Sequence, residues 1–144
     1  MPRVTLRPVR LQRLVERTVQ LGAATLPMRL HACSAGDAVF SLSVLDVADP
    51  AQVTPLLAAL REQEIANLSA TVAEQRGFAP DGATPNPESA RMRMVGRRPD
   101  GRPVVADAAF FVKGLRLYQA TILGSDKAPG REAVDTFFGA IRLP

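Results

Sequence analysis

Tryptophan is absent from this chain of 144 residues, and tyrosine, histidine and cysteine each occur once. A single cysteine, Cys33, excludes an internal disulfide and therefore does not indicate the redox compartment. The chain also lacks the paired catalytic carboxylates, the nucleophile motif, the metal-ligand cluster and the phosphate-binding loop that mark many enzymes. We therefore expect a protein that is not an enzyme and that uses no cofactor.

Long apolar runs are missing as well. The longest, at residues 104–112, is interrupted by Asp107 and is much shorter than the roughly 20 residues that a membrane-spanning helix needs. The sequence thus predicts no transmembrane segment. No apolar stretch with a small-residue cleavage site follows Met1, so no signal peptide is visible. We expect a periplasmic or membrane-anchored protein if a leader has been trimmed before Met1, and a cytoplasmic protein otherwise.

Lysine is scarce, because sixteen of the 18 basic residues are arginine. Nucleic-acid-binding surfaces usually combine positive charge with Lys-rich loops or stacking aromatic residues, which this chain lacks. The composition therefore argues against nucleic acid as a partner. A protein partner that we cannot identify from the sequence is the better expectation, bound by a monomer or a homodimer of this chain.

The positive charge is concentrated in residues 91–102, which hold five arginines against one acid, Asp100. They follow a loop at residues 77–87 that is too rich in Gly and Pro for a regular element. Loops on a rigid sheet and arginine side chains are both common in recognition surfaces. The alternative is that these arginines only keep a sheet face or edge solvated. The candidate partner surface consists of Arg91, Arg93, Arg97, Arg98 and Arg102.

Period-two alternation predicts strands in the first third of the chain. Residues 25–32 and 39–46 alternate apolar with polar or small side chains, and the segment between them, 34–37, has turn chemistry. We therefore expect an antiparallel hairpin, preceded by a further strand at 14–21.

A long helix should follow this hairpin. It begins either with Asp49 as the capping residue and Pro50 in its first turn, or with Thr54 as the cap and Pro55 as the first helical residue. An apolar face at helical spacing predicts about five turns that pack on the sheet. The residues of this face are Leu57, Leu60, Ile65, Leu68 and Val72. Two acids of the same helix, Glu62 and Glu64, are expected to be solvated charges.

The last third of the chain predicts three antiparallel strands in series and a short amphipathic helix. The strand with Met92 and Met94 reaches a turn at residues 99–101, and strands at 104–112 and 115–123 meet at a reversal. Asp107 is expected on the outer face of its strand, where a carboxylate needs no partner. A helix at 133–138 covers the sheet. The residues expected to be largely buried are Phe110 or Phe111, Leu117, Phe137 and Phe138.

His31 and Cys33 lie two residues apart and so share one face of a strand. Two such ligands could begin a metal site, but a catalytic site needs three protein ligands and a structural one four. Nothing in the sequence marks the missing ligands. A structural role for both residues is the better interpretation, because free cysteine is commonly buried as a small apolar side chain. We therefore expect no specific metal.

Several segments together resemble a known family. The resemblance runs over roughly residues 14–143 and is to the small bacterial PsbP-like proteins, a fold shared with the PsbP subunit of photosystem II, with a nuclear-import factor that binds Ran, and with periplasmic lipoproteins of the DcrB type. The segments that carry it are Phe-Ser-Leu-Ser-Val-Leu-Asp-Val at 40–47, Asp49-Pro50, Asp-Gly-Arg at 100–102, Phe-Phe-Val-Lys-Gly-Leu-Arg-Leu-Tyr-Gln-Ala-Thr at 110–121, the Phe-Phe helix at 133–138, and Ile-Arg-Leu at 141–143.

The resemblance implies one α+β domain over residues 1–144, an α/β/α sandwich with a central antiparallel sheet of about six strands. Its members bind partners and do not catalyse reactions, so it implies a non-catalytic interaction or accessory module of the bacterial cell envelope. Type VI secretion chaperones resemble the same fold, dimerise and shield apolar segments of effectors, so an intracellular adaptor or chaperone is an alternative. A metal-binding protein or enzyme using His31 and Cys33 is a third, weaker one.

Overall fold

The computed structural model describes residues 11–125 and 130–143, in which the strands form a single antiparallel sheet. Its order across the sheet is β1-β2-β3-β7-β6-β5-β4. The strands are β1 (Leu11–Leu21), β2 (Ala24–Ala35), β3 (Ala38–Asp46), β4 (Thr71–Gly77), β5 (Ala90–Arg97), β6 (Pro103–Lys113) and β7 (Arg116–Gly124). The α+β class with a central antiparallel sheet is thus confirmed, with seven strands in the described residues where about six were predicted.

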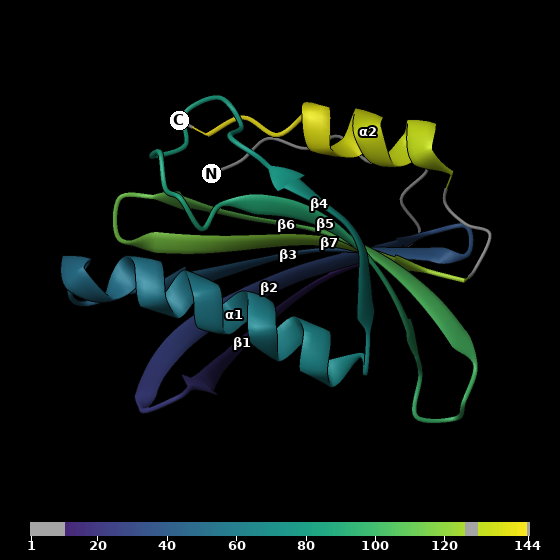
Figure 1. Cartoon of the computed structure of the whole chain (residues 1–144), viewed down its shortest axis with the longest axis horizontal. Helices are drawn as coiled ribbons and strands as arrows, with labels where there is room; N and C mark the ends of the chain where they lie inside the picture. The colour runs from purple at the N-terminus through teal and green to yellow at the C-terminus, as the bar shows by residue number, and fades with distance from the viewer. Residues whose placement is uncertain (1–10, 126–129, 144) are drawn as a thin grey trace.

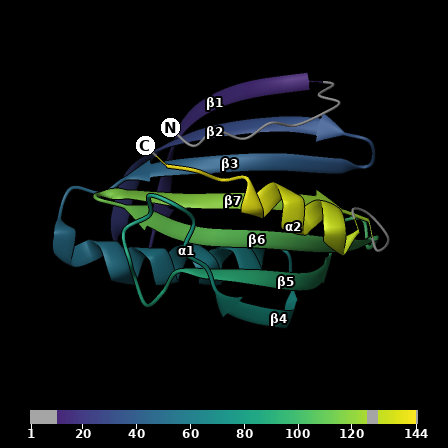
Figure 2. The ribbon, with the colours of Figure 1, turned by 90° about the horizontal axis from the view of Figure 1, so that it is seen from above.

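Two helices cover opposite faces of the sheet (Figure 1). Helix α1 (Val53–Asn67) follows a short 3-10 turn (Pro50–Gln52) and packs on one face. Helix α2 (Arg131–Gly139) packs on the other face, above the middle strands (Figure 2). Neither described helix is both long and apolar enough to cross a membrane. The single domain over residues 1–144 stays a prediction, and residues 1–10, 126–129 and 144 lie outside the described part.

The first hairpins form where the alternation predicted them. Leu21 pairs with Ala24 at the first turn and Ala35 with Ala38 at the second, so each turn has only two residues between paired positions. Gly22 and Gly36 each adopt a φ of 61°, the left-handed conformation that two-residue hairpins favour and that glycine adopts without strain. The predicted strands at 14–21, 25–32 and 39–46 are therefore confirmed.

The predicted long helix is wrong at its C-terminal end. Helix α1 ends at Asn67, Ser69 takes a left-handed φ of 46°, and Val72 lies in strand β4 instead of on the helix. The Leu68 carbonyl accepts a hydrogen bond from the Arg97 backbone N–H across the sheet end, which fixes the reversal. At the other end Asp49 accepts from the Ala51 N–H and caps the 3-10 turn, as the first of the two predicted starts requires.

Each face of the sheet has its own apolar core. Beneath α1 the core centres on Leu45, Leu57 and Phe110, and beneath α2 it centres on Phe111 and Phe138. The Phe40 and Phe137 rings lie 5.1 Å apart and join β3 to α2. The prediction of buried residues is confirmed for all of its members: Phe110, Phe111, Leu117, Phe137 and Phe138.

Two backbone hydrogen bonds hold the Gly- and Pro-rich loop between β4 and β5. The Thr84 N–H donates to the Val112 carbonyl, and the Leu143 N–H donates to the Asp81 carbonyl. At Gly82, with a φ of 87°, a Cβ would lie 2.2 Å from the Leu143 carbonyl oxygen, so only glycine fits this approach. The loop is therefore part of the packed structure, beside α2.

Candidate functional site

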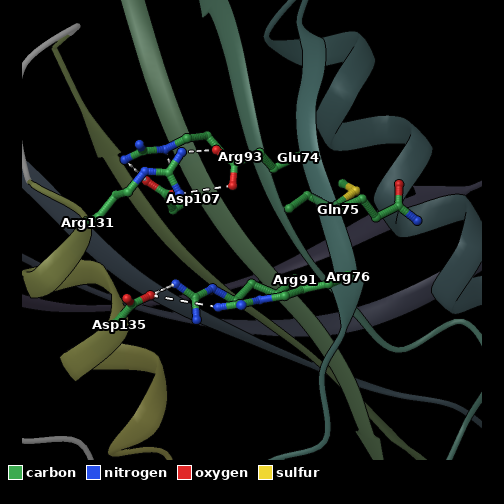
Figure 3. A pocket seen from close by; sticks show the side chains of 9 residues that line it. Glu74, Gln75, Arg76, Arg91, Arg93, Asp107, Arg131 and Asp135 are labelled. Carbon is green, nitrogen blue, oxygen red and sulfur yellow. Dashed lines mark hydrogen bonds and ion pairs between the residues drawn. The ribbon is translucent and has the colours of Figure 1, made fainter.

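Two pockets lie on opposite faces of the sheet. The first, called here the arginine pocket, has a volume of about 180 Å³ and lies between α2 and the strands β4, β5 and β6 (Figure 3). The second, called the α1 pocket, has a volume of about 200 Å³ and lies between the C-terminal half of α1 and the strands β1, β2, β3 and β7.

The floor of the arginine pocket is an ion pair between neighbouring strands. Arg93 on β5 lies opposite Asp107 on β6, and its Nε and one Nη donate to the two carboxylate oxygens at 3.0 and 3.1 Å. The Asp107 side chain is only 7% exposed. The sequence-based expectation that Asp107 faces solvent is therefore wrong. A carboxylate on this covered face needs a partner, and the planar guanidinium one strand away supplies it in a two-point geometry.

The second group in the pocket gathers around Asp135 on α2. Its carboxylate accepts from Arg91 on β5 and lies 3.9 Å from the Arg76 guanidinium on β4. The Arg91 hydrogen bond, reinforced by the charge of Arg91, Arg76 and Arg131, holds the pKa of Asp135 below its usual value. Arg91 also lies over the Phe138 ring, 4.9 Å from its centre. These contacts tie α2 to the sheet.

A third pair closes the rim of the arginine pocket. Arg131, the first residue of α2, donates through both Nη atoms to the Glu74 carboxylate on β4, one of the contacts being 2.9 Å. Each of the three carboxylates in the pocket is thus held by an arginine. Together the three ion pairs connect α2, β4, β5 and β6 around the pocket.

The structure divides the five arginines of the predicted partner surface into two groups. Arg91 and Arg93 lie under α2 with side chains 17% and 21% exposed, so the interpretation of these two as solvated charges is wrong. Arg97, Arg98 and Arg102 lie at the turn between β5 and β6, where Arg97 donates to the Gly101 carbonyl. Arg102 binds Asp100, and its backbone N–H is the main cause of a lowered pKa of that carboxyl. Partner binding by this surface stays a prediction.

The α1 pocket combines apolar walls with a polar floor. Val19, Leu21, Met28 and Leu60 contribute apolar side chains. At the floor Gln119 on β7 donates to the Glu64 carboxylate on α1 and to the Thr121 hydroxyl, the latter at 3.2 Å. The remaining lining residues are Arg17, Ser43, Gln63 and Asn67.

Glu64 is half-buried, so the expectation of a solvated helix charge is wrong for it, whereas Glu62 is exposed as expected. Burial raises the pKa of Glu64, and the hydrogen bonds from Gln119 and Thr121 offset only part of this. The helical spacing did carry a signal, because Glu64 follows Leu57 and Leu60 at intervals of seven and four residues and so shares their face. Gln119 gave no signal, since its partner is 55 residues away.

His31 and Cys33 lie side by side on the face of β2 that α2 covers, since they oppose Leu42 and Phe40 of β3. Cys33 is buried, as predicted, and burial raises the pKa of its thiol. Within the described ranges, 11–125 and 130–143, no group of three or more His, Cys, Asp or Glu side chains comes together as a metal site. The absence of a specific metal stays a prediction.

Comparison with known proteins finds similarity at the level of fold. No family model and no curated protein matches this chain. The crystal structure of PA94 from Pseudomonas aeruginosa, a protein of unknown function, superposes with a TM-score of 0.53 at 12% sequence identity, over 90% of this chain and 96% of that chain. The two proteins therefore share an overall fold along nearly their whole length. The resemblance to the PsbP-like proteins stays a prediction.

Proposed function

We propose that this protein is a non-catalytic module that binds another protein. The observation that carries the proposal is the size and chemistry of the two pockets, about 180 and 200 Å³. Small-molecule sites usually enclose roughly 300–1,000 Å³. Pockets of the size found here accommodate one or two side chains of a partner. Their carboxylates are held by arginine or glutamine side chains, which suits recognition better than proton transfer.

An acidic partner segment is the natural ligand for the turn between β5 and β6. Arg97, Arg98 and Arg102 crowd this turn, and Asp100 balances only one of the three charges. Arginine forms two-point contacts with carboxylates and packs its stem on apolar surface, so it is frequent in interfaces. Association through this turn should be steered by charge and should slow as salt is added.

The first setting for such a module is an accessory role in the bacterial cell envelope, on the basis of the PsbP-like resemblance. Within it, the protein would act by holding a partner at the turn arginines. The PsbP-like fold, an α/β/α sandwich, is supported by the two helices on opposite faces of the antiparallel sheet.

The α1 pocket favours a second candidate function, an intracellular adaptor or chaperone of the type VI secretion kind. Such a protein shields apolar segments, and four apolar side chains line this pocket around a polar floor. A partner side chain with an apolar stem and a polar tip would satisfy both parts, because the tip would meet Glu64 and Gln119.

Capture of partners from the native organism, compared between variants, tests the proposal. Arg97→Glu with Arg98→Glu removes the turn arginines, and Gln63→Arg with Asn67→Arg fills the rim of the α1 pocket with exposed side chains. The matched controls place the same charge changes elsewhere: Lys113→Glu with Arg116→Glu at the far end of β6 and β7, and Gln52→Arg with Ala66→Arg on exposed positions of the 3-10 turn and α1.

We expect a protein that wild type and both controls capture and that one of the blocked variants loses. Loss with the turn variant supports an acidic partner, and loss with the rim variant supports the adaptor. The compartment of the captured protein then separates the envelope setting from the intracellular one. Equal capture by every variant, with unfolding midpoints unchanged, would show that neither surface binds the partner.

A further inference from the structure

Strand β4 forms one edge of the sheet (Figure 2). Within residues 11–125 and 130–143 it pairs with β5 alone, and no backbone hydrogen bond from another described segment reaches residues 71–77. An edge strand with unpaired N–H and C=O groups is a template for a further strand. This edge can therefore pair with a strand from another chain.

The side chains of this edge carry a self-complementary charge pattern. Glu74 and Arg76 lie opposite Arg93 and Arg91 of β5, so both lie on the face covered by α2, and Gln75 between them faces the other way. The Glu74 and Arg76 side chains are 50% and 68% exposed, respectively. Glu74 binds Arg131, while Arg76 is 3.9 Å from Asp135. Opposite charges thus stand two residues apart on an accessible edge.

We propose that β4 pairs antiparallel with β4 of a second copy of this chain, about a two-fold axis at Gln75. An axis perpendicular to the sheet keeps each face on its own side, so directly opposed residues must belong to the same face. Centring the axis on Gln75 meets this condition. It sets Glu74 against Arg76 of the second copy and Arg76 against Glu74 of that copy. Two reciprocal cross-strand ion pairs result.

The opposite edge of the sheet does not offer the same match. In β1, Glu16 and Arg17 are adjacent and lie on opposite faces of the sheet, so no self-pairing about an axis perpendicular to the sheet sets one against the other, and a pairing centred on either residue opposes like charges. Like charges directly opposite one another destabilise a strand pair. The charge pattern therefore favours β4 over β1 as the site of self-association.

The contact should be reversible. A bulge between Val72 and Glu74 interrupts the register of β4 with β5, so the regular part of the edge is short. A short edge buries little surface, and interfaces that bury little surface are typical of weak or transient complexes. We expect a dissociation constant in the micromolar range that rises with salt, because the two ion pairs are accessible to solvent.

Sedimentation equilibrium over a range of protein and salt concentrations tests the pairing through charge exchange. Glu74→Arg and Arg76→Glu each replace both ion pairs by like-charge contacts and should weaken the dimer at least about tenfold. The exchanged variant, Glu74→Arg with Arg76→Glu, restores both pairs across the axis and should dimerise as wild type does. A mixture of the two single variants should form a heterodimer, because its opposed charges are again unlike.

The exchanged variant also separates this pairing from contacts within one chain. It places like charges against Arg131 and Asp135, so recovery of the dimer cannot come from restored contacts to α2. A wild-type chain that stays monomeric up to millimolar concentration would overturn the proposal. A dimer that neither single variant weakens, or that the exchange fails to restore, would overturn it equally.

A cross-link gives a second measurement that does not depend on charge. In a Cys33→Ser background, Gln75→Cys should form a disulfide with its own copy, since directly opposed residues in an antiparallel pair have Cα atoms about 4.5–5.5 Å apart, within disulfide reach. Glu74→Cys alone should not cross-link, because it opposes Arg76. Equal cross-linking at both positions would contradict a register centred on Gln75.

Discussion

At the scale of single residues, two carboxylates lie where water reaches them poorly, and each is held by a different kind of partner. Asp107 accepts two hydrogen bonds from a guanidinium, whereas Glu64 accepts from the amide of Gln119. Removing the charge of Asp107 leaves a covered guanidinium without its counter-charge, whereas Glu64 has only neutral donors and burial raises its pKa. The two positions should therefore respond in opposite ways when the carboxylate is replaced by its amide.

Replacing Asp107 should destabilise the protein. Asp107→Asn leaves the Arg93 charge largely covered and without its counter-charge, which should lower the free energy of unfolding by about 3 kcal/mol. Asp46→Asn is the control, because its pair with Arg116 is about half exposed and should contribute less than about 1 kcal/mol. Urea unfolding of the two variants measures the difference. Equal small losses would mean that Asp107 is solvated after all.

Replacing Glu64 should stabilise the protein at neutral pH. The pKa of Glu64 in the folded state lies above its ordinary value of 4.5. At a pH between the ordinary and the raised pKa, Glu64 therefore binds more protons in the folded state than in the unfolded state. The free energy of unfolding therefore falls as pH rises through this window, and the loss is complete above it. Glu64→Gln removes the loss, so its unfolding midpoint should exceed that of wild type at pH 7. The two should converge below pH 4.5.

The control for this titration is Glu62→Gln, which changes an exposed carboxylate on the same helix. Because this side chain is exposed, the unfolding midpoint of Glu62→Gln at pH 7 should stay close to that of wild type. A Glu64→Gln variant that is less stable than wild type at pH 7 would show that the charged hydrogen bond with Gln119 outweighs the cost of burial.

At the scale of elements, α2 and all described strands except β4 could be predicted from the sequence because each carries a local signal. The alternation in β2 and β3 and the Phe-rich face of α2 are readable within a few residues. The end of α1 was not readable, since Leu68 and Val72 continue the helical spacing. Two contacts determine where α1 ends: the hydrogen bond from the Arg97 N–H to the Leu68 carbonyl, and the pairing of Val72 with Met94. Arg97 and Met94 are both distant from α1 in the sequence.

The same limit applies to the candidate site. The arginine content of residues 91–102 predicted a partner surface in this segment, and the turn arginines lie within it. It could not show that Arg93 meets Asp107, because the pair depends on the register of β5 and β6. Nor could it show the α1 pocket, whose lining comes from five elements. Local chemistry was predictable, and the pairing of distant side chains was not.

Helix α2 should depend on its two phenylalanines. Phe138→Ala removes a fully buried ring beneath the helix and should lower the free energy of unfolding by about 3–5 kcal/mol, and Phe137→Ala should act in the same direction. Glu132→Ala, an exposed position of the same helix, is the control and should change little. Thermal unfolding checks this. If neither phenylalanine variant shifted the midpoint, the packing of α2 on the sheet would be wrong.

At the scale of the whole molecule, we propose three surfaces for contacts with other proteins: the turn arginines, the α1 pocket and the β4 edge. The α1 pocket is lined by α1, β1, β2, β3 and β7 and by no residue of β4, so a dimer paired through β4 would leave this pocket accessible in each copy. A dimer would then present this pocket twice, and two copies acting on one partner bind more tightly than either alone. Self-association and partner binding can thus be measured separately.

The most direct test of the account is the affinity of a captured partner for wild type and for the blocked variants. Titration calorimetry should show that the variant at one surface, either Arg97→Glu with Arg98→Glu or Gln63→Arg with Asn67→Arg, binds at least about tenfold more weakly. Its matched control should bind as wild type does, and all chains should remain folded at the temperature of the measurement. Equal affinities in wild type, both blocked variants and both controls, with every fold intact, would contradict the account.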